Sequence, residues 1–276
     1  MNAPPGPDRP DPPAAPYHPA GPHRPVPNTV RLAPHQAATL VWPAVDRVFR
    51  AGMAATSQGG AELCQRYGGP SAIGFLVDFR TRLAAPGGTV SAAQLAALTR
   101  YVDPTECQRI LDKQVAHGMI HRHDDGGISA TVRGRSFLVE LYDLHARVTA
   151  ELWAGHDERV RRLVGTLGRL LDAALTDPTC GDGAFRAMAP PYEPDGTPPG
   201  VLLLNRLGAL RCHRADAHAA AWQAAGHTAR SIVALPPGPE RLAIELETDR
   251  RAAGPYAALS PPERLRLLAD LAALPG

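Results

Sequence analysis

Ionisable side chains that could do chemistry gather on one expected helix, residues 201–225. Projected at about 100° per residue, this helix has an apolar face made of Leu203, Leu207, Leu210, Ala217 and Ala221. Arg214 falls within that face, His213 and His218 flank it on opposite sides, and Asp216 lies further round. A charge on a buried face must be paired or must bind a group of opposite charge. The helix therefore predicts either a buried ion pair or a binding site.

Two interpretations of Arg214 stay open. In the structural one, Arg214 forms a buried ion pair with Glu245 or Glu247 and holds two helices together. In the functional one, the guanidinium group binds a carboxylate, because arginine offers two parallel donors, and His213 or His218 transfers protons.

An arginine from a second helix, residues 74–85, would complete an electropositive cavity for an anionic, partly apolar small molecule. Arg82 is preferred to Arg80 for that role. We expect no metal site here, because His213 and His218 are five residues apart and point about 140° from each other around a helix.

A second group of side chains has the types that recognise DNA, and it follows the capping residue Asp103 and Pro104. The candidate DNA contacts are Thr105, Gln108, Arg109, Lys113 and Arg122. Arginine and glutamine form paired hydrogen bonds to guanine and adenine, whereas lysine, threonine and the arginine of the following strand would reach phosphates. Residues 89–147 carry seven basic and seven acidic side chains. Because phosphate neutralisation supplies most non-specific affinity, DNA binding and a structural role both stay open.

Local signals predict how these side chains are positioned. Ser91 caps a helix that buries Leu95 and Leu98, and the next helix runs from Pro104 to Gly118. Residues 119–123 and 128–132 are predicted to form two strands. The tight turn 124–127, with the sequence Asp-Asp-Gly-Gly, joins them. Helix, turn, helix and hairpin together predict a winged helix over residues 89–147.

The sequence VSAAQLAALTRYVDPTECQRILDKQVAHGMIHRHDDGGISATVRGRSFLVEL resembles the MarR-type winged helix. It departs from that pattern at the hairpin tip, where an arginine usually follows an aspartate and 124–127 has none. The resemblance implies a dimeric, ligand-responsive transcription regulator that binds duplex DNA. The shorter segments GFLVDFRTRLAAPGG and LRCHRADAHAAAW resemble the SalK-like proteins of actinobacteria. Arg82 falls where those proteins keep an arginine, and this resemblance is the reason for preferring it to Arg80. That second resemblance implies the alternative, a small-molecule enzyme or binding protein in which the winged helix is structural.

The remaining periodicity predicts a mostly α-helical protein in which long helices flank the hairpin. The expected organisation is a disordered proline-rich tail at 1–33, a helical region at 34–176, a linker at 177–200 and a C-terminal helical domain at 201–276. Further helices are expected at 35–49, 60–67, 71–83, 134–152, 157–175, 240–253 and 261–273, with Pro43 kinking or interrupting the first. The apolar stripe of 157–175 suits either the core or a homodimer seam. We expect the C-terminal helices to pack on 74–85.

Composition narrows the classes of function. Twelve of the 29 prolines lie between Met1 and Pro34, so this segment cannot form a regular core. A net charge of +2 excludes a histone-like binder. The four cysteines lie far apart, without a CxxC pair, and no long apolar run or secretory signal is evident. We therefore expect a cytoplasmic protein with no cofactor and no membrane partner, and the sequence leaves open whether it is an enzyme.

Overall fold

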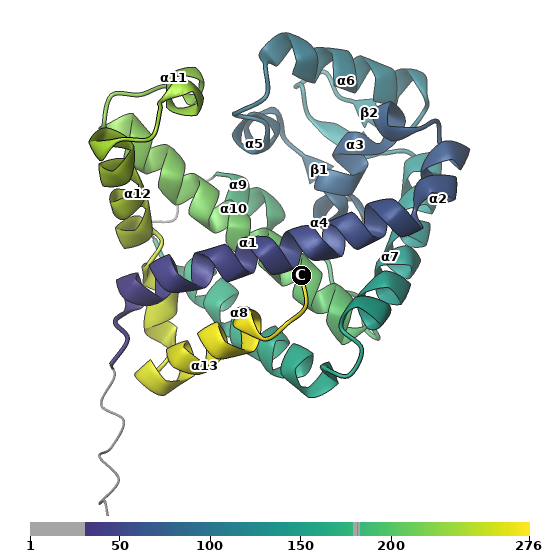
Figure 1. The fold of residues 1–276 in the computed structure, drawn as a ribbon. Coiled ribbons are helices and arrows are strands. Elements are labelled where there is room, and N and C mark those ends of the chain that lie inside the picture. The colour runs from purple at the N-terminus through teal and green to yellow at the C-terminus, as the bar shows by residue number, and fades with distance from the viewer. Residues whose placement is uncertain (1–30, 179–180, 182) are drawn as a thin grey trace, which may run out of the picture. The chain divides into compact units, whose positions relative to one another are not determined.

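The computed structural model of the chain describes residues 31–178, 181 and 183–276. Helices make up most of the described chain, with one small antiparallel sheet (Figure 1), so the prediction of a mostly α-helical fold is confirmed. The helices before the sheet's second strand are α1 (Pro34–Gly59), α2 (Ala61–Arg66), α3 (Pro70–Asp78), α4 (Arg80–Leu83), α5 (Ala92–Leu98) and α6 (Pro104–Ala116). Those after its third strand are α7 (Val132–Leu152), α8 (Asp157–Thr176), α9 (Ala184–Met188), α10 (Pro199–Ala224), α11 (Ala229–Ala234), α12 (Pro239–Arg251), the 3₁₀-helix η1 (Gly254–Ala258) and α13 (Pro261–Ala272).

The sheet has three strands, β1 (Thr89–Val90), β2 (Ile120–Arg122) and β3 (Ile128–Ala130), in the order β1-β3-β2. The expected hairpin is β2 and β3, with His121 opposite Ser129. The short extended piece before α5 adds β1 to the other edge of β3, where Val90 lies opposite Ile128. The strands are shorter than expected, because residues 131 and 132 already belong to the start of α7.

Capping residues set the start of the helices next to the sheet. The Ser91 hydroxyl accepts a hydrogen bond from the Gln94 N–H, and the Asp103 carboxylate accepts from the N–H groups of Thr105 and Glu106. Gly118, with φ of +66°, follows α6 and turns the chain into β2. These local predictions are confirmed.

Two early helices differ from expectation. α1 continues through Pro43 to Gly59, because Val41, Val45 and Val48 on both sides of the proline are fully buried and hold the helix together. The expected helix at 71–83 divides at Phe79, where φ is −103° and ψ is 18°. The residues after Phe79 therefore face directions that a continuous helix would not give them.

Two short helices were missed. The expected linker at 177–200 contains α9, which forms because Phe185 is fully buried among side chains distant in sequence. α11 lies between the helices expected at 201–225 and 240–253, where no helix was expected, and reciprocal hydrogen bonds between Thr228 and Ser231 start it.

Two large clusters of buried side chains occupy the described chain. One joins α1, α8, α10, η1 and α13, and the other joins α3 to α7 and the sheet. The apolar stripe of α8 is buried within the chain, mainly against α10. This burial favours the core role over the homodimer seam for those side chains. The C-terminal helices pack chiefly on α1 and α8, and α1 extends ten residues beyond its expected end. The expected packing on the 74–85 segment is limited to α10, whose Cys212 packs against the cluster that contains Phe79 and Leu83.

Most of the expected tail, residues 1–30, lies outside the described residues. At its end, Leu32 is buried and its carbonyl accepts a hydrogen bond of 2.7 Å from the Arg264 Nη1. The packed part of the chain therefore begins before Pro34. Within the described residues, no helix combines the length and the apolar character that a bilayer crossing needs.

Candidate functional site

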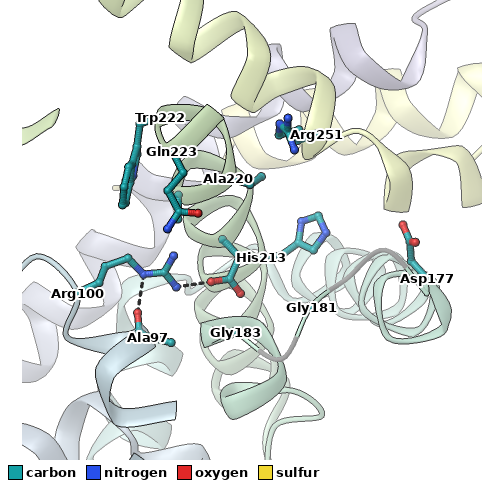
Figure 2. A pocket seen from close by; sticks show the side chains of 13 residues that line it. Ala97, Arg100, Asp177, Gly181, Gly183, His213, Ala220, Trp222, Gln223 and Arg251 are labelled. Atoms are coloured by element: carbon teal, nitrogen blue, oxygen red, sulfur yellow. Dashed lines mark hydrogen bonds and ion pairs between the residues drawn. The ribbon is translucent and has the colours of Figure 1, made fainter. Parts of the chain in front are cut away.

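A cleft of 660 Å³ lies between the end of α5 and the C-terminal half of α10 (Figure 2). We call it the α5–α10 cleft. Its lining comprises Ala97, Arg100, Asp177, Gly181, Gly183, His213, Asp216, Ala217, Ala219, Ala220, Trp222, Gln223 and Arg251. Of the predicted ligand-binding residues, His213 and Asp216 line it.

An ion pair between Arg100 and Asp216 joins the two sides of the cleft. The side chains are only 15% and 22% exposed. The Arg100 Nε also donates to the Ala97 carbonyl at 2.6 Å, and Asp216 accepts the backbone N–H groups of Ala184 (3.0 Å) and Phe185 (2.7 Å). Several donors on one carboxylate fix its position. Asp216 is therefore a rigid part of the cleft wall.

Gly183 allows this arrangement. A Cβ atom at Gly183 would lie 2.6 Å from the carboxyl carbon of Asp216, closer than any real Cβ contact. The sequence analysis assigned this segment only to the linker at 177–200, so this requirement was missed. Among the described residues, no atom lies within 4 Å of a Cβ placed on Gly181.

His213 supplies a neutral imidazole to the cleft. Its side chain is buried and packs edge-to-face against the Phe185 ring, with centroids 5.3 Å apart. Burial lowers the pKa of His213, although the charges of Asp216 and Asp177 act in the opposite direction. A neutral imidazole has one donor and one acceptor nitrogen, so His213 can hydrogen-bond to a ligand near neutral pH.

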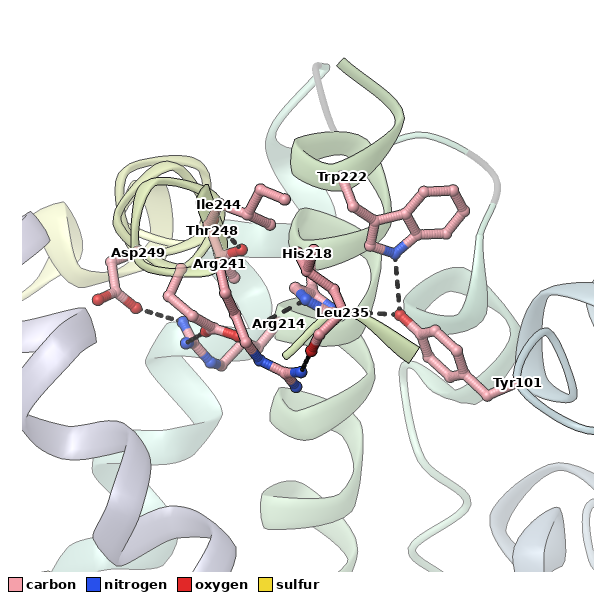
Figure 3. Close-up of polar contacts among 10 residues, drawn as sticks. Tyr101, Arg214, His218, Trp222, Leu235, Arg241, Ile244, Thr248 and Asp249 are labelled. Carbon is pink, nitrogen blue, oxygen red and sulfur yellow. Dashed lines mark hydrogen bonds and ion pairs between the residues drawn. The ribbon is translucent and has the colours of Figure 1, made fainter. Parts of the chain in front are cut away.

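A hydrogen-bonded chain of aromatic residues lies beside the cleft (Figure 3). The Trp222 Nε1 donates to the Tyr101 hydroxyl at 3.1 Å, and that hydroxyl lies 3.0 Å from the His218 Nδ1. Burial lowers the pKa of His218, and the nearby charge of Glu245 partly offsets this. These contacts connect the turn after α5 to α10 and keep the Trp222 ring against the cleft.

Arg214 lies on another side of α10, in a buried ion pair with α12. Its guanidinium contacts Asp249 and, at 3.1 Å, Glu245, and it stacks 4.8 Å from the Trp42 ring centroid. The space next to Arg214 is only 10 Å³, too small for a ligand. The structure thus places Arg214 in the structural arrangement, with the predicted Glu245 and with Asp249, which was not predicted. Glu247 instead pairs with Arg250 and Arg251.

The five predicted ligand-binding residues do not converge. Arg82 donates to the Thr89 carbonyl at 2.9 Å and lines no part of the cleft. His218 contacts Tyr101 and Glu245, and His213 and Asp216 face the cleft without Arg214. The residues that sequence reasoning missed are Ala97, Arg100, Trp222, Gln223 and Arg251. A helical projection could not find them, because α10 contacts helices on several sides and carries buried residues on more than one face.

The predicted DNA contacts are all exposed on α6 and β2. Their charges are partly neutralised within the chain. Arg109 is paired with Glu106 three residues earlier, and Arg122 donates to the Gln108 side chain at 2.7 Å and lies 3.6 Å from Asp112. The hydrogen bond with Arg109 lowers the pKa of Glu106, so this carboxylate stays charged. Thr105 and Lys113 extend the same exposed surface.

No group of three or more histidine, cysteine, aspartate or glutamate side chains in the described part of the chain is placed to hold a metal ion. The exposed imidazole of His123 instead lies 3.0 Å from the Ser129 hydroxyl. Compared with known proteins, the chain matches no family model, no curated protein and no solved structure.

Proposed function

We propose that the protein binds a small molecule in the α5–α10 cleft. The observation that carries the proposal is that a space of 660 Å³ is lined by polar groups: a partly buried ion pair, an imidazole, an amide and an indole ring. Binding sites for small molecules are typically concave, of about 300–1,000 Å³, with few polar groups among apolar ones. This is the small-molecule alternative implied by the SalK-like resemblance, and the helix–hairpin segment would serve as one wall.

The lining favours a ligand without net charge. Arg100 is paired with Asp216 and Arg251 with Glu247 of α12, so both arginines already have a carboxylate partner. Ala217, Ala219 and Ala220 supply an apolar strip on α10, so a flat apolar group with a neutral or zwitterionic polar part fits better than the anion expected from the sequence. The geometry supports binding, and it assigns no reaction.

The proposal is tested by thermal melts with uncharged and zwitterionic aromatic compounds, such as benzamide, phenylalanine and tryptophan, and with benzoate for comparison. A compound present at about a hundredfold its Kd should raise the melting temperature by about 5 °C. Ala220→Phe fills the cleft and should abolish the shift. Ala224→Phe, one turn further along α10 at an exposed position, should keep it.

If no compound of the panel stabilises the wild-type protein, or if Ala220→Phe responds like the wild type, the cleft is not the binding site.

A second candidate function is DNA binding by a winged helix, as the MarR-type resemblance implies. One observation favours it: Thr105, Gln108, Arg109, Lys113 and Arg122 are all exposed on α6 and β2. A DNA-binding protein of this type would retain a mixed-sequence duplex at low salt and lose it steeply as salt rises. Arg109→Ala should weaken specific binding by about 1–3 kcal/mol. Absence of retention at low salt would remove this candidate and leave the cleft proposal intact.

A further inference from the structure

A group of buried polar side chains lies away from the cleft, where α4, α7 and α10 meet. Arg80 and Thr81 come from α4, His145 from α7 and Asn205 from α10, and their exposed fractions are 3%, 4%, 0% and 1%. Tyr142, one turn before His145, borders the group, and its ring centroid lies 6.4 Å from that of His145. We call these five residues the Arg80 cluster.

The hydrogen-bonding capacity of the Arg80 cluster is largely unused. The Arg80 Nη1 donates to the Val77 carbonyl at 3.1 Å, but its Nε has no acceptor in the described part of the chain. Both ring nitrogens of His145 and the Thr81 hydroxyl also make no hydrogen bond there. The Asn205 amide has no hydrogen bond of good geometry either, although it lies close enough to Tyr142 to act on the pKa of that phenol. Buried polar groups are nearly always hydrogen-bonded. So many unused groups in one place indicate a missing polar partner.

The charge of Arg80 is only partly compensated. The Asp78 carboxylate acts on it electrostatically, but no ion pair joins Arg80 to a carboxylate of the described residues. Burial raises the pKa of Tyr142 to about 12 and that of the Cys212 thiol to about 12, so both neighbours are neutral. Burial and the charge of Arg80 lower the pKa of His145 well below its usual value. Because arginine stays protonated, a cation without an ion-pair partner among the described residues lies next to these neutral groups.

Two other buried arginines show how this chain satisfies such a charge internally. Arg214 is paired with two carboxylates. Arg264 donates from its Nε to the Tyr256 carbonyl and from its Nη1 to the Leu32 carbonyl, at 2.8 and 2.7 Å. Among the described residues, the Arg80 side chain donates to only one carbonyl oxygen, although Arg80 is at least as buried as Arg264.

We propose that the Arg80 cluster is a binding site for a small monovalent anion, either inorganic or the carboxylate of a small organic acid. Arg80 supplies the charge and the free Nε–H, and the imidazole N–H of His145, the Thr81 hydroxyl and the Asn205 amide supply further donors. The site is separate from the α5–α10 cleft and does not depend on the function proposed for it.

The test is the thermal stability of the purified chain at constant ionic strength. Gluconate serves as a bulky reference anion and is replaced stepwise by formate, chloride or nitrate. At least one small anion should raise the melting temperature in a saturable way, by about 5 °C at a hundredfold its Kd. A response to formate alone assigns a carboxylate ligand, whereas a response to chloride or nitrate assigns an inorganic one.

Variants separate the site from general salt effects. Arg80→Met should melt no lower than the wild type in gluconate, since it removes an unpaired charge, and it should not respond to small anions. Arg82→Met, two residues along the same short helix and partly exposed, should respond like the wild type. His145→Glu places a carboxylate beside Arg80, so it should raise the melting temperature in gluconate and abolish the anion response. This last variant keeps the test decisive if Arg80→Met does not fold.

The proposal is overturned if the melting temperature of the wild type is the same in gluconate and in all three small anions. It is equally overturned if Arg80→Met or His145→Glu keeps the full wild-type response.

Discussion

Two sides of α10 each carry an arginine–carboxylate ion pair, and they differ in what surrounds it. On the α12 side, Arg214 contacts two carboxylates and the Trp42 ring, with 10 Å³ of free space. On the α5 side, the pair of Arg100 and Asp216 forms the wall of a 660 Å³ cleft. Similar chemistry thus holds helices together on one side and leaves room for a ligand on the other.

This difference shows that a buried charge by itself does not mark a binding site. In the sequence, Arg214 was conspicuous because it lies on an apolar face, whereas Arg100 stood among ordinary helix residues. The space beside an ion pair depends on which helices pack there. That packing joins residues that are more than a hundred positions apart, such as Arg100 and Asp216.

The largest effect is expected on the Arg214 side. Arg214→Met leaves Asp249, 10% exposed, as an unpaired buried carboxylate. Unpairing a buried charge costs about 3–5 kcal/mol, so the free energy of unfolding in urea should fall by that amount. The affinity for a cleft ligand should stay unchanged. The matched control is Arg250→Met on the exposed face of α12, which should change stability by less than about 0.5 kcal/mol. A loss of ligand affinity in Arg214→Met without a loss of stability would reverse the roles of the two sides.

Gly183→Ala should disturb the wall of the α5–α10 cleft more than the packing of the core. The added Cβ displaces the Asp216 carboxylate, which breaks its hydrogen bonds to the α9 backbone. We expect a loss of about 1–3 kcal/mol in stability and loss of ligand-induced stabilisation. The Cβ of Gly181→Ala meets no atom of the described residues within 4 Å, so this variant should leave both quantities unchanged. Equal behaviour of the two variants would show that the Asp216 position does not matter for the cleft.

Two histidines of α10 should contribute to the pH dependence of stability, because burial lowers the pKa of His213 and of His218. With a folded-state pKa below the unfolded value of about 6.5, each histidine binds protons more readily when the chain is unfolded. Stability is therefore complete above about pH 6.5 and falls as the pH drops through the window between the unfolded and folded pKa values.

Urea unfolding at pH 7.5 and 5.5 checks this, and the difference between the two pH values should shrink in His213→Gln and in His218→Gln. His121→Gln, at an exposed strand position, should keep the wild-type difference. An unchanged pH dependence in both of the first two variants would contradict the assigned pKa directions.

The smallest expected effect concerns the aromatic chain beside the cleft. Tyr101→Phe removes the hydroxyl that accepts from the Trp222 Nε1 and contacts the His218 ring. A single hydrogen bond of this kind contributes about 0.5–1.5 kcal/mol, measurable in urea unfolding. Tyr192→Phe is a useful comparison, because the Tyr192 backbone, and not its hydroxyl, makes its hydrogen bonds within the described residues. An equal effect of both changes would show that the Tyr101 hydroxyl does not stabilise the cleft wall.

Sequence signals predicted the helix–hairpin segment well because they are local. Ser91, Asp103 and Gly118 each act on backbone groups within a few residues, so their roles follow from residue type and position. The short helix α9 has no such signal, and its stability comes from the burial of Phe185 against distant helices.

The candidate sites were predicted only in part. Arg82 was preferred to Arg80 because it falls where the SalK-like proteins keep an arginine, but the helix breaks at Phe79 and Arg80 is the buried one of the two. His213 and Asp216 were recognised as site residues, whereas Arg100 was counted only as one of seven basic charges. Which helices meet along α10 is a tertiary property that helical periodicity does not contain.

The central claim, that the α5–α10 cleft binds a small molecule, is tested most directly by the indole signals of the three tryptophans. In ¹⁵N-tryptophan-labelled protein, Trp222 reports on the cleft and Trp42 reports on the Arg214 side of α10, and Trp222→Phe assigns the cleft signal. Titration with the best compound of the aromatic panel should move the Trp222 signal in a saturable way and leave the Trp42 signal in place. A panel in which no compound moves Trp222, or in which Trp42 moves while Trp222 does not, would contradict the account.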